Sequence, residues 1–420
     1  MRRRLRSSAR VVSLSWGLID QSFSSATNLG LTVIAGRITG PGGLGVVYLG
    51  FSAYLVALTM QRALVTDPLI VSSARHTPQE RVADTRAALA MVLSGAAMWT
   101  ALLLVLGLTL PASVGAGLLL FVPWLIGALV QDFWRALLFR DGRGAAAAVN
   151  DGAWAAAMAV SLPLLLVVHS SWMVVLTWGI GALVGALLGF AQTGLRPAAL
   201  TASLRWWRKS AWPLARWLGP EAGLVILQGQ VIVFALVAVL GTVDVGGLRA
   251  VQAVFAPMTL LAQAISLPGL PMLTAMAASS RRLARIWAMR LSAIGVSLVF
   301  AYLALLLILP RHLIGAVFGS AFDRFDSLVA PVGVMQLLAA WALGMSLLVK
   351  AEGRVGWLLL SRLIAATVTV VLTITLAVTS GLTAAAWGLT LGVVTGAISI
   401  TLIAFRSAGR PAAALADSAH

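Results

Sequence analysis

The chain has 420 residues, of which 60% are hydrophobic and only 10% are charged. Soluble domains carry about 25% charged residues, so this chain has less than half of the usual solubilising charge. Apolar stretches of roughly 20 residues, the length that crosses a bilayer, recur from one end to the other. The composition therefore excludes a soluble enzyme, a nucleic-acid-binding protein and a disordered scaffold, and it predicts a protein embedded in a membrane.

Twelve hydrophobic stretches, each bounded by charged residues or by glycine and proline, predict an all-α polytopic membrane protein. The first six stretches are residues 12–36, 43–65, 86–110, 113–138, 145–168 and 172–192. The second six are residues 214–240, 247–273, 288–309, 325–348, 356–379 and 383–405. The basic N-terminal string MRRRLRSSAR is followed by polar residues and by no small-residue cleavage site, so the first stretch is predicted to be an uncleaved span.

The basic residues behind the net charge of +17 alternate between the two ends of the predicted helices. Twenty-six Lys and Arg residues fall on the side that holds both chain termini, whereas only Arg37, Arg249, Arg311 and Arg324 fall on the other side. Because Lys and Arg accumulate in cytoplasmic loops, both termini are predicted to be cytoplasmic. This placement explains the charge by membrane topology, so no nucleic-acid partner is expected.

The second half of the chain repeats the first. The string GGL at 42–44 recurs at 246–248, LLFRDGR at 137–143 recurs as LLVKAEGR at 347–354, and glycines at 181, 185 and 189 recur at 388, 392 and 396. Six spans per half is an even number, so both halves have the same orientation. We therefore expect two six-helix lobes related by a pseudo-two-fold axis along the membrane normal, with the substrate site between them.

The predicted domains follow from this repeat. They are an N-terminal six-helix lobe at 1–195, a cytoplasmic interfacial linker at 196–213, a C-terminal six-helix lobe at 214–405 and a cytoplasmic tail at 406–420. The linker region places several tryptophans among basic residues. That composition is typical of an amphipathic segment lying against anionic headgroups.

Polar residues in the first span and at the start of the seventh are the main functional candidates. Gln21 and Asn28 share one helical face, with Asp20 beside them. A carboxylate inside the membrane costs about 2.5–3.5 kcal/mol, so Asp20 is expected to face a cavity or a partner. Glu221 occupies the matching position in the second half, with Gln228 two turns further on, although a helix-capping role also explains Glu221. We expect Asp20 and Glu221 to carry ion coupling.

Two arginines are candidates for binding an anionic substrate. Arg62 lies near the inner end of the second span, and Arg249 lies near the outer end of the eighth. Snorkelling to the nearest headgroups is the alternative explanation for each. Other charged residues, at the inner ends of spans four and ten, predict a network that fixes the following loops: Asp132, Arg135, Arg140, Asp141, Arg143 and Asp151, mirrored by Lys350, Glu352, Arg354 and Arg362.

The sequence contains no sign of catalysis. Cysteine is absent and the four histidines are isolated, so neither a metal-ligand spacing nor a nucleophile motif occurs. A membrane glycosyltransferase would need an acidic sugar-nucleotide site or a large extramembrane loop, and the chain has neither. We expect no enzyme activity, no cofactor and no metal, and a transporter is the economical interpretation.

Four features together carry a resemblance to a known family: the polar first span, GPGGLGVVYLGF at the entry to span two, RALVTDPLIV at its exit, and QDFWRALLFRDGRGAAAAVND. They resemble the bacterial polysaccharide and O-antigen-type flippases of the multidrug/oligosaccharidyl-lipid/polysaccharide exporter superfamily. The loop after span two does not fit the signature of the major facilitator superfamily, which also has a six-plus-six repeat. The lipid II flippases typically have fourteen spans, which argues against that branch.

The resemblance implies a flippase in the bacterial cytoplasmic membrane that moves polyprenyl-linked oligosaccharide precursors outward by alternating access. On this hypothesis Arg62 and Arg249 bind the diphosphate, while Gln21, Asn28 and Gln228 bind sugar hydroxyls. The implied partners are the lipid-linked oligosaccharide, membrane lipids and other polysaccharide-assembly proteins. A cation-coupled multidrug exporter of the same superfamily is the first alternative, and a non-transporting scaffold in envelope polysaccharide assembly is the second.

Overall fold

The computed structural model describes residues 2–73, 76–308, 313–352 and 354–406. For residues 2–29, and for some other helical positions that include Glu221, it describes the backbone but not the side chain. The described backbone forms helices joined by short turns and contains no strand. Two compact units result: Met1–Ala250 with Val317–Ala321, and Val251–Ala316 with Phe322–His420. These units differ from the lobes drawn from the sequence repeat, whose boundaries stay a prediction.

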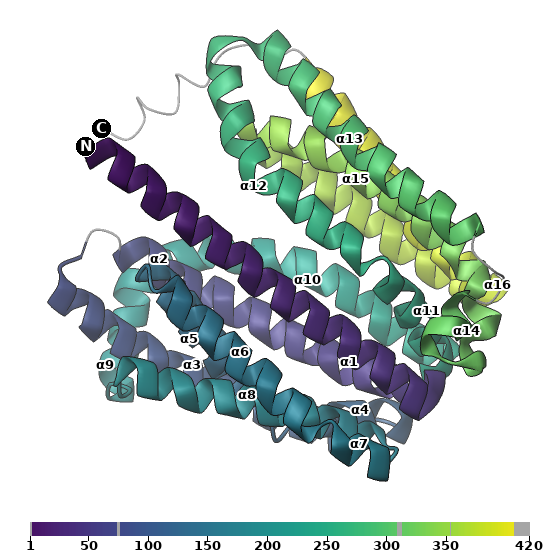
Figure 1. The fold of residues 1–420 in the computed structure, drawn as a ribbon, viewed down its shortest axis with the longest axis horizontal. Coiled ribbons are helices and arrows are strands. Elements are labelled where there is room, and N and C mark those ends of the chain that lie inside the picture. The colour runs from purple at the N-terminus through teal and green to yellow at the C-terminus, as the bar shows by residue number, and fades with distance from the viewer. Residues whose placement is uncertain (1, 74–75, 309–312, 353, 407–420) are drawn as a thin grey trace. The chain divides into compact units, whose positions relative to one another are not determined.

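The helices run side by side within each unit (Figure 1). The chain forms, in order, α1 (Arg2–Gln61), η1 (Arg62–Thr66), α2 (Asp67–Ser73), α3 (Pro78–Thr109), α4 (Ala112–Phe121), α5 (Leu125–Arg140), α6 (Gly144–Ser161), α7 (Pro163–Val167), α8 (Ser171–Thr193), α9 (Leu200–Trp206), η2 (Trp207–Ala211), α10 (Trp212–Leu240) and α11 (Thr242–Val254). It continues with α12 (Ala256–Ser279), α13 (Arg281–Ile308), α14 (Leu313–Phe318), η3 (Ser320–Leu328), α15 (Val329–Ala351) and α16 (Val355–Phe405).

These helices occupy all twelve hydrophobic stretches predicted from the sequence. Eight helical stretches among the described residues are long and apolar enough to cross a membrane, and α4 with α5 forms a ninth that is bent by 55°. Three more spans complete the twelve. One is α12, and the other two arise because a glycine divides α1 and α16 into two spans each. Span eight is broken between α11 and α12, at Phe255, two residues before Pro257.

Glycine makes the sharp turns between paired spans. Gly40 has φ 66° and ψ −176°, and Gly241 has φ 88° and ψ 172°. This part of backbone conformational space is essentially restricted to glycine, because a Cβ would clash there. The turn between spans one and two therefore has nearly the same backbone geometry as the turn between spans seven and eight. The glycines of these two turns are 201 positions apart in the sequence. Gly381 makes a similar break within α16, with φ 79° and ψ −165°.

The α1 and α11 helices approach so closely after these turns that only glycine fits between them. A Cβ built on Gly45 would overlap the carbonyl oxygen of Thr242, and a Cβ built on Gly246 would overlap that of Pro41. Gly246 and Thr242 lie 201 positions beyond Gly45 and Pro41 respectively. The contact is therefore reciprocal, as expected where two equivalent segments meet across a local two-fold axis.

The repeat is also visible in the turns that follow α5 and α15. The amide of Arg143 donates to the carbonyl of Leu138 at 2.8 Å, and the amide of Arg354 donates to that of Val349 at 3.0 Å. Arg143 has φ −92° and ψ 47°, while Arg354 has φ −91° and ψ 43°. The matching strings LLFRDGR and LLVKAEGR thus fold into the same turn, which confirms the repeat read from the sequence.

The predicted interfacial linker is helical, but two of its tryptophans pack into protein. Trp206 lies in a buried cluster with Leu89 and Trp134, and the indole of Trp207 donates to the carbonyl of Leu64 at 2.9 Å. Trp212, in contrast, is 45% exposed. The hydrogen bond and the buried area hold this segment on the helices around it, and its contact with a membrane surface stays a prediction.

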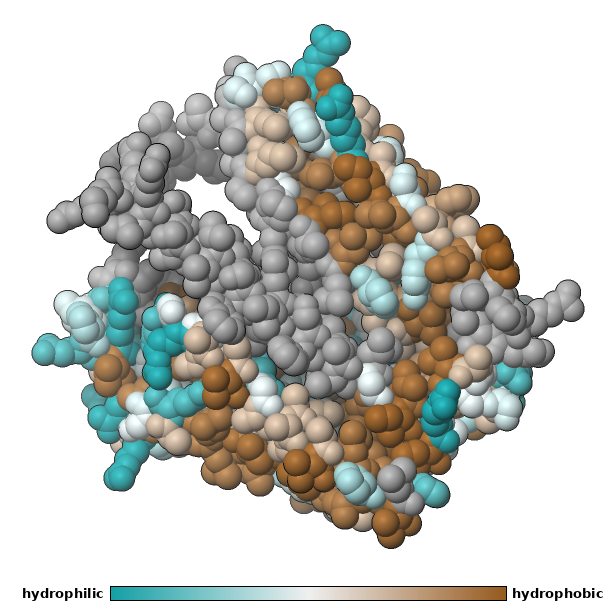
Figure 2. All heavy atoms as spheres, viewed as in Figure 1, coloured by the Kyte–Doolittle hydropathy of each residue, from teal (hydrophilic) through white to brown (hydrophobic). Residues whose placement is uncertain are grey.

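The helix flanks of both units expose large apolar side chains, as a lipid environment requires. Examples in the first unit are Met98, Val105 and Leu108 on α3, and Val160 on α6, each more than half exposed. Figure 2 shows hydrophobic residues along the flanks of the helices, with the hydrophilic residues gathered towards helix ends. Water would leave these apolar flanks unsolvated, so the described helices are those of a membrane protein.

Candidate substrate-binding site

The first unit contains a cavity beside Arg249. It has a volume of about 120 Å³ and lies among both arms of α1, α4, α8 and α11. The residues that line it are Leu31, Thr32, Ala35, Leu44, Val47, Tyr48, Phe51, Phe121, Val174, Val175, Trp178 and Arg249. Arg249 is the one charged residue in this lining. The cavity is smaller than the roughly 300–1,000 Å³ of most small-molecule sites, so in this conformation it holds one chemical group and not a whole ligand.

The guanidinium of Arg249 stacks on an aromatic ring. Its Cζ atom lies 4.5 Å from the centroid of the Tyr48 ring, within the range of a cation–π interaction. This contact orients the guanidinium without neutralising its charge, because the ring is not an anion. The positive charge of Arg249 therefore remains at the cavity for an anionic group.

Aromatic side chains form the floor of the cavity. Trp178 packs edge-on against Phe51 at 6.2 Å and against Tyr54 at 5.1 Å between ring centroids, and Phe121 lies 5.3 Å from Trp178. These rings come from three different helices, so they fix the helices relative to one another and exclude water. An ion held by Arg249 would interact in surroundings of low dielectric, where electrostatic attraction is stronger than in water.

Arg62, the other predicted phosphate ligand, is paired with a carboxylate. Its Nε atom donates to Asp132 at 2.9 Å, and its Nη2 atom donates to the other oxygen of the same carboxylate. The Arg62 side chain is 44% exposed, whereas the Asp132 side chain is only 6% exposed. Next to Arg62, the amide of Gln61 donates to the carbonyl of Leu129 at 2.9 Å. These bonds fix the end of α1 on α5.

The two candidate arginines lie far apart along α1. Arg249 stacks on Tyr48, and Arg62 follows Tyr48 by fourteen helical steps, a rise of about 21 Å at 1.5 Å per residue. A single diphosphate is much shorter than this distance. A single diphosphate therefore could not reach both Arg249 and Arg62 in the observed conformation.

A second polar cluster joins α5, α6 and α8. The Gln131 amide donates to Asp151 at 2.8 Å, Asp151 pairs with Arg135 at 3.2 Å, and the Asn150 amide donates to the carbonyl of Gly185 at 2.8 Å. Asn150 also donates to the side-chain oxygen of Gln192 at 3.3 Å. These bonds pair the buried polar groups and balance the charge of Asp151, so the cluster holds the three helices together.

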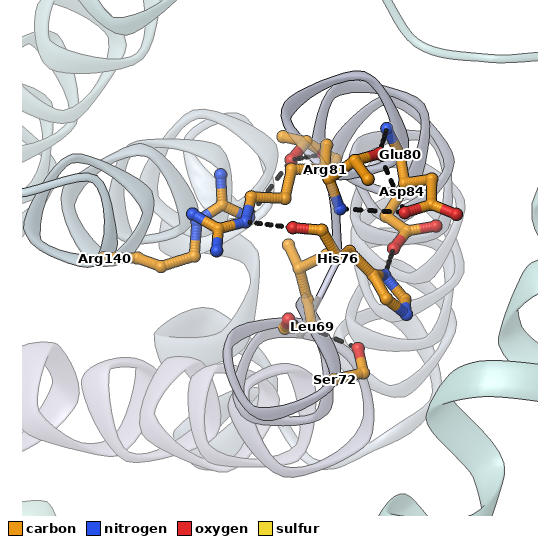
Figure 3. A network of polar contacts seen from close by, with 9 residues as sticks. Leu69, Ser72, His76, Glu80, Arg81, Asp84 and Arg140 are labelled. Atoms are coloured by element: carbon orange, nitrogen blue, oxygen red, sulfur yellow. Dashed lines mark hydrogen bonds and ion pairs between the residues drawn. The ribbon is translucent and has the colours of Figure 1, made fainter. Parts of the chain in front are cut away.

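Polar contacts also fix the start of α3 (Figure 3). The Thr77 hydroxyl and the Glu80 carboxylate form a capping box at the start of α3, and His76 lies 2.6 Å from Asp84. Arg81 donates to the carbonyl of His76 at 3.0 Å, and Arg140 at the end of α5 donates to Thr85 at 3.2 Å. The capping box explains why α3 begins at Pro78, eight residues before the predicted start of the hydrophobic span.

The remaining predicted site residues lie on two helices. Asp20, Gln21 and Asn28 belong to α1 and Glu221 belongs to α10, but their side chains are outside the described part of the structure. Gln228 is half-buried on α10 and does not line the cavity beside Arg249. The proposed roles of all four stay predictions.

Sequence reasoning missed Tyr48, Trp178 and Asp132 as parts of the candidate sites. Tyr48 lies within the quoted string GPGGLGVVYLGF, but the string does not indicate that a residue 201 positions away would stack on its ring. Asp132 was expected to join the loop network with Arg135, and the structure pairs it with Arg62 from another helix. Both pairings join residues that are remote in sequence, so neither has a local sequence signal.

Comparison with solved structures identifies the fold. The lipid II flippase MurJ in an inward closed conformation matches with a TM-score of 0.69 at 11% identity, over 93% of this chain and 87% of that one. An inward-facing multidrug resistance MATE family transporter of the MOP superfamily matches with a TM-score of 0.64 at 13% identity, over 93% of each chain. The chain has the fold of the MOP-superfamily transporters. The predicted fold class, with twelve membrane-spanning helices in two lobes, is thereby confirmed.

A third neighbour shows that the binding pocket varies within this fold. It is a MOP superfamily transporter from Pyrococcus furiosus, described by a reverse polarity of its binding pocket that suggests a different function. It matches with a TM-score of 0.57 at 16% identity, over 93% of each chain. No protein-family model matches this chain, and no curated protein matches it in sequence. The fold therefore leaves the substrate to be argued from the charges at the site.

Proposed function

We propose that this protein is a flippase that moves polyprenyl-linked oligosaccharide precursors across the bacterial cytoplasmic membrane by alternating access. The proposal rests on the position of Arg249. Its guanidinium stacks on the Tyr48 ring, and Arg249 is the one charged residue that lines the cavity. Arg binds phosphate oxygens through two parallel N–H donors, which suits the diphosphate of such a substrate. The lipid II flippase among the structural neighbours supports a lipid-linked substrate.

In this proposal Arg249 receives the diphosphate, while Gln21, Asn28 and Gln228 bind sugar hydroxyls. Arg62 is a second phosphate ligand at the other end of α1, and it becomes available when its pair with Asp132 opens. Asp20 and Glu221 couple transport to an ion. The termini are cytoplasmic, in keeping with the 26 basic residues on their side of the membrane.

A cation-coupled multidrug exporter is the second candidate, favoured by the MATE transporters among the neighbours. A cationic drug would need a cavity that carries carboxylates and aromatic rings. At the cavity beside Arg249 the rings are present, but the one charged side chain repels a cation. The charge of Arg249 therefore separates the two functions experimentally.

The test is translocation of a fluorescent polyprenyl-diphosphate oligosaccharide in proteoliposomes that contain the full chain. Arg249→Ala should lower the translocation rate at least about tenfold. A tenfold change corresponds to roughly 1.4 kcal/mol, which is in the range expected for the loss of one charge-assisted hydrogen bond. Arg249→Lys should give an intermediate rate, since Lys keeps the charge and loses the paired donors. Arg208→Ala, at an exposed position on η2, is the matched control and should transport normally.

Gene deletion in the native cell separates the remaining functions. Loss of surface polysaccharide is expected for the flippase. Unchanged polysaccharide combined with sensitivity to cationic dyes would instead assign the protein as a drug exporter. Loss of polysaccharide without translocation by the purified protein would assign it as a scaffold.

A further inference from the structure

The second unit contains a groove beside α15 and α16. It has a volume of about 460 Å³ and lies between α15 and the two arms of α16. Its lining residues are Ala339, Ala342, Leu343, Ser346, Leu347, Lys350, Arg362, Ala365, Val393, Gly396 and Ala397. Small and apolar side chains thus form its walls, and its two charged residues are both cations.

The repeat explains why the groove is open. The shared turn aligns Arg143 with Arg354, and the shared glycine stripes align Gly189 with Gly396. On this alignment two large residues of the first half, Trp154 and Phe190, correspond to alanines of the groove at 365 and 397. In the first half those side chains fill the space: Trp154 packs on Trp178, and Phe190 packs on Trp134. Their replacement by alanine empties the equivalent space in the second half.

The charge beside the groove is also opposite to the charge at the equivalent position of the first half. Asp151, which pairs with Arg135 in the first half, corresponds to Arg362 in the second, and Arg135 corresponds to Ser346. No carboxylate lines the groove. The nearby Glu352 is already paired with Arg281 and Arg354, at 3.2 Å each. Nothing among the described lining residues therefore balances Lys350 and Arg362.

We propose that this groove binds an anionic membrane phospholipid, with the headgroup phosphate at Lys350 and Arg362 and an acyl chain along the alanine and glycine wall. Basic pockets between helices at the cytoplasmic surface are suited to anionic lipid headgroups. Both cations lie at the helix ends that the charge distribution predicts to be cytoplasmic. A bilayer provides a phospholipid at this position at all times, so we assign the groove to a membrane lipid and not to the transported substrate.

The test measures lipid binding to the purified full chain by native mass spectrometry and by thermal unfolding in detergent. Phosphatidylglycerol should bind with higher affinity than phosphatidylcholine and should raise the melting temperature. The double variant Lys350→Ala/Arg362→Ala should weaken phosphatidylglycerol binding at least about tenfold. The control double variant Arg282→Ala/Arg290→Ala removes the same charge from exposed positions on α13 that do not line the groove, and it should bind as the wild type does.

A second variant tests the groove without changing its charge. Ala365→Trp introduces the residue found at the equivalent position of the first half and should abolish lipid binding by filling the space.

Equal binding of the two lipids, or equal loss in the control double variant, would overturn the proposal. Displacement of phosphatidylglycerol by one equivalent of undecaprenyl phosphate would also overturn it, and would assign the groove to the carrier lipid. Because binding is measured without transport, the result is independent of the proposed flippase activity.

Discussion

Gly45 and Gly246 make the same contact in opposite directions. Each lies against a backbone carbonyl of the other's helical turn, so that neither position has room for a Cβ. The two glycines are 201 positions apart, the same offset as between the matching turns at Gly40 and Gly241, so the repeat produces a two-fold contact. The structure thus pairs Gly246 with Gly45, whereas the GGL strings align it with Gly42. This contact holds α1 against α11, next to the cavity that contains Tyr48 and Arg249.

Gly45→Ala and Gly246→Ala should each destabilise the protein, by similar amounts of about 1–3 kcal/mol, because a methyl group overlaps a carbonyl oxygen that cannot move freely. The control is Gly229→Ala on α10, where a Cβ meets nothing within 4 Å. That change should leave stability unchanged or raise it by about 0.5–1 kcal/mol, since alanine favours the helix. Thermal unfolding in detergent measures all three variants, and unchanged stability of both contact variants would show that the helices do not meet in this way.

The Arg62–Asp132 pair should show strong coupling in a double-mutant cycle. Arg62→Ala leaves a buried carboxylate without its cation, so it should lower stability more than the double variant Arg62→Ala/Asp132→Ala does. A coupling energy of roughly 1–3 kcal/mol is expected for groups in direct contact. Additive effects in thermal unfolding would contradict the pair. If the double variant is stable but does not transport, Arg62 has the second role proposed for it.

Topology can be measured with single cysteines, because the chain has none of its own. Cysteine at His169 or Ser380 should react with a membrane-impermeant thiol reagent in intact cells, and cysteine at Arg208 or Ser279 should not. All four positions are exposed in the structure, so access is decided by the side of the membrane. Labelling of the Arg208 position from outside would reverse the predicted orientation.

Replacement of the membrane carboxylates tests ion coupling. Asp20→Asn should abolish transport while expression stays normal, because an amide cannot exchange a proton or hold a cation by charge. Glu221→Gln should impair transport less, since a helix-start position also explains that residue. Translocation by both variants is measured in proteoliposomes across a series of pH values. Transport by Asp20→Asn at the wild-type rate throughout the series would exclude Asp20 as the coupling group.

The sequence alone determined the membrane location, the twelve helical segments, the internal repeat and the candidate arginines. Hydrophobic length, the alternation of basic residues and short repeated strings are local properties, and the backbone in a bilayer must satisfy its own hydrogen bonds as helices. The matching turns at Arg143 and Arg354 are an example of structure determined locally, because each turn is specified by a few neighbouring residues.

Only the tertiary structure decided which of these residues meet. Tyr48 with Arg249, Arg62 with Asp132, and the alanine-lined groove of the second unit all join segments that are distant in the chain. Residue identity fixed the charge of each group, but its partner was set by the packing of helices around glycine and aromatic contacts. For this reason the sequence predicted two phosphate-binding arginines, but in the folded chain Arg249 lies beside the cavity, whereas Arg62 is paired with Asp132.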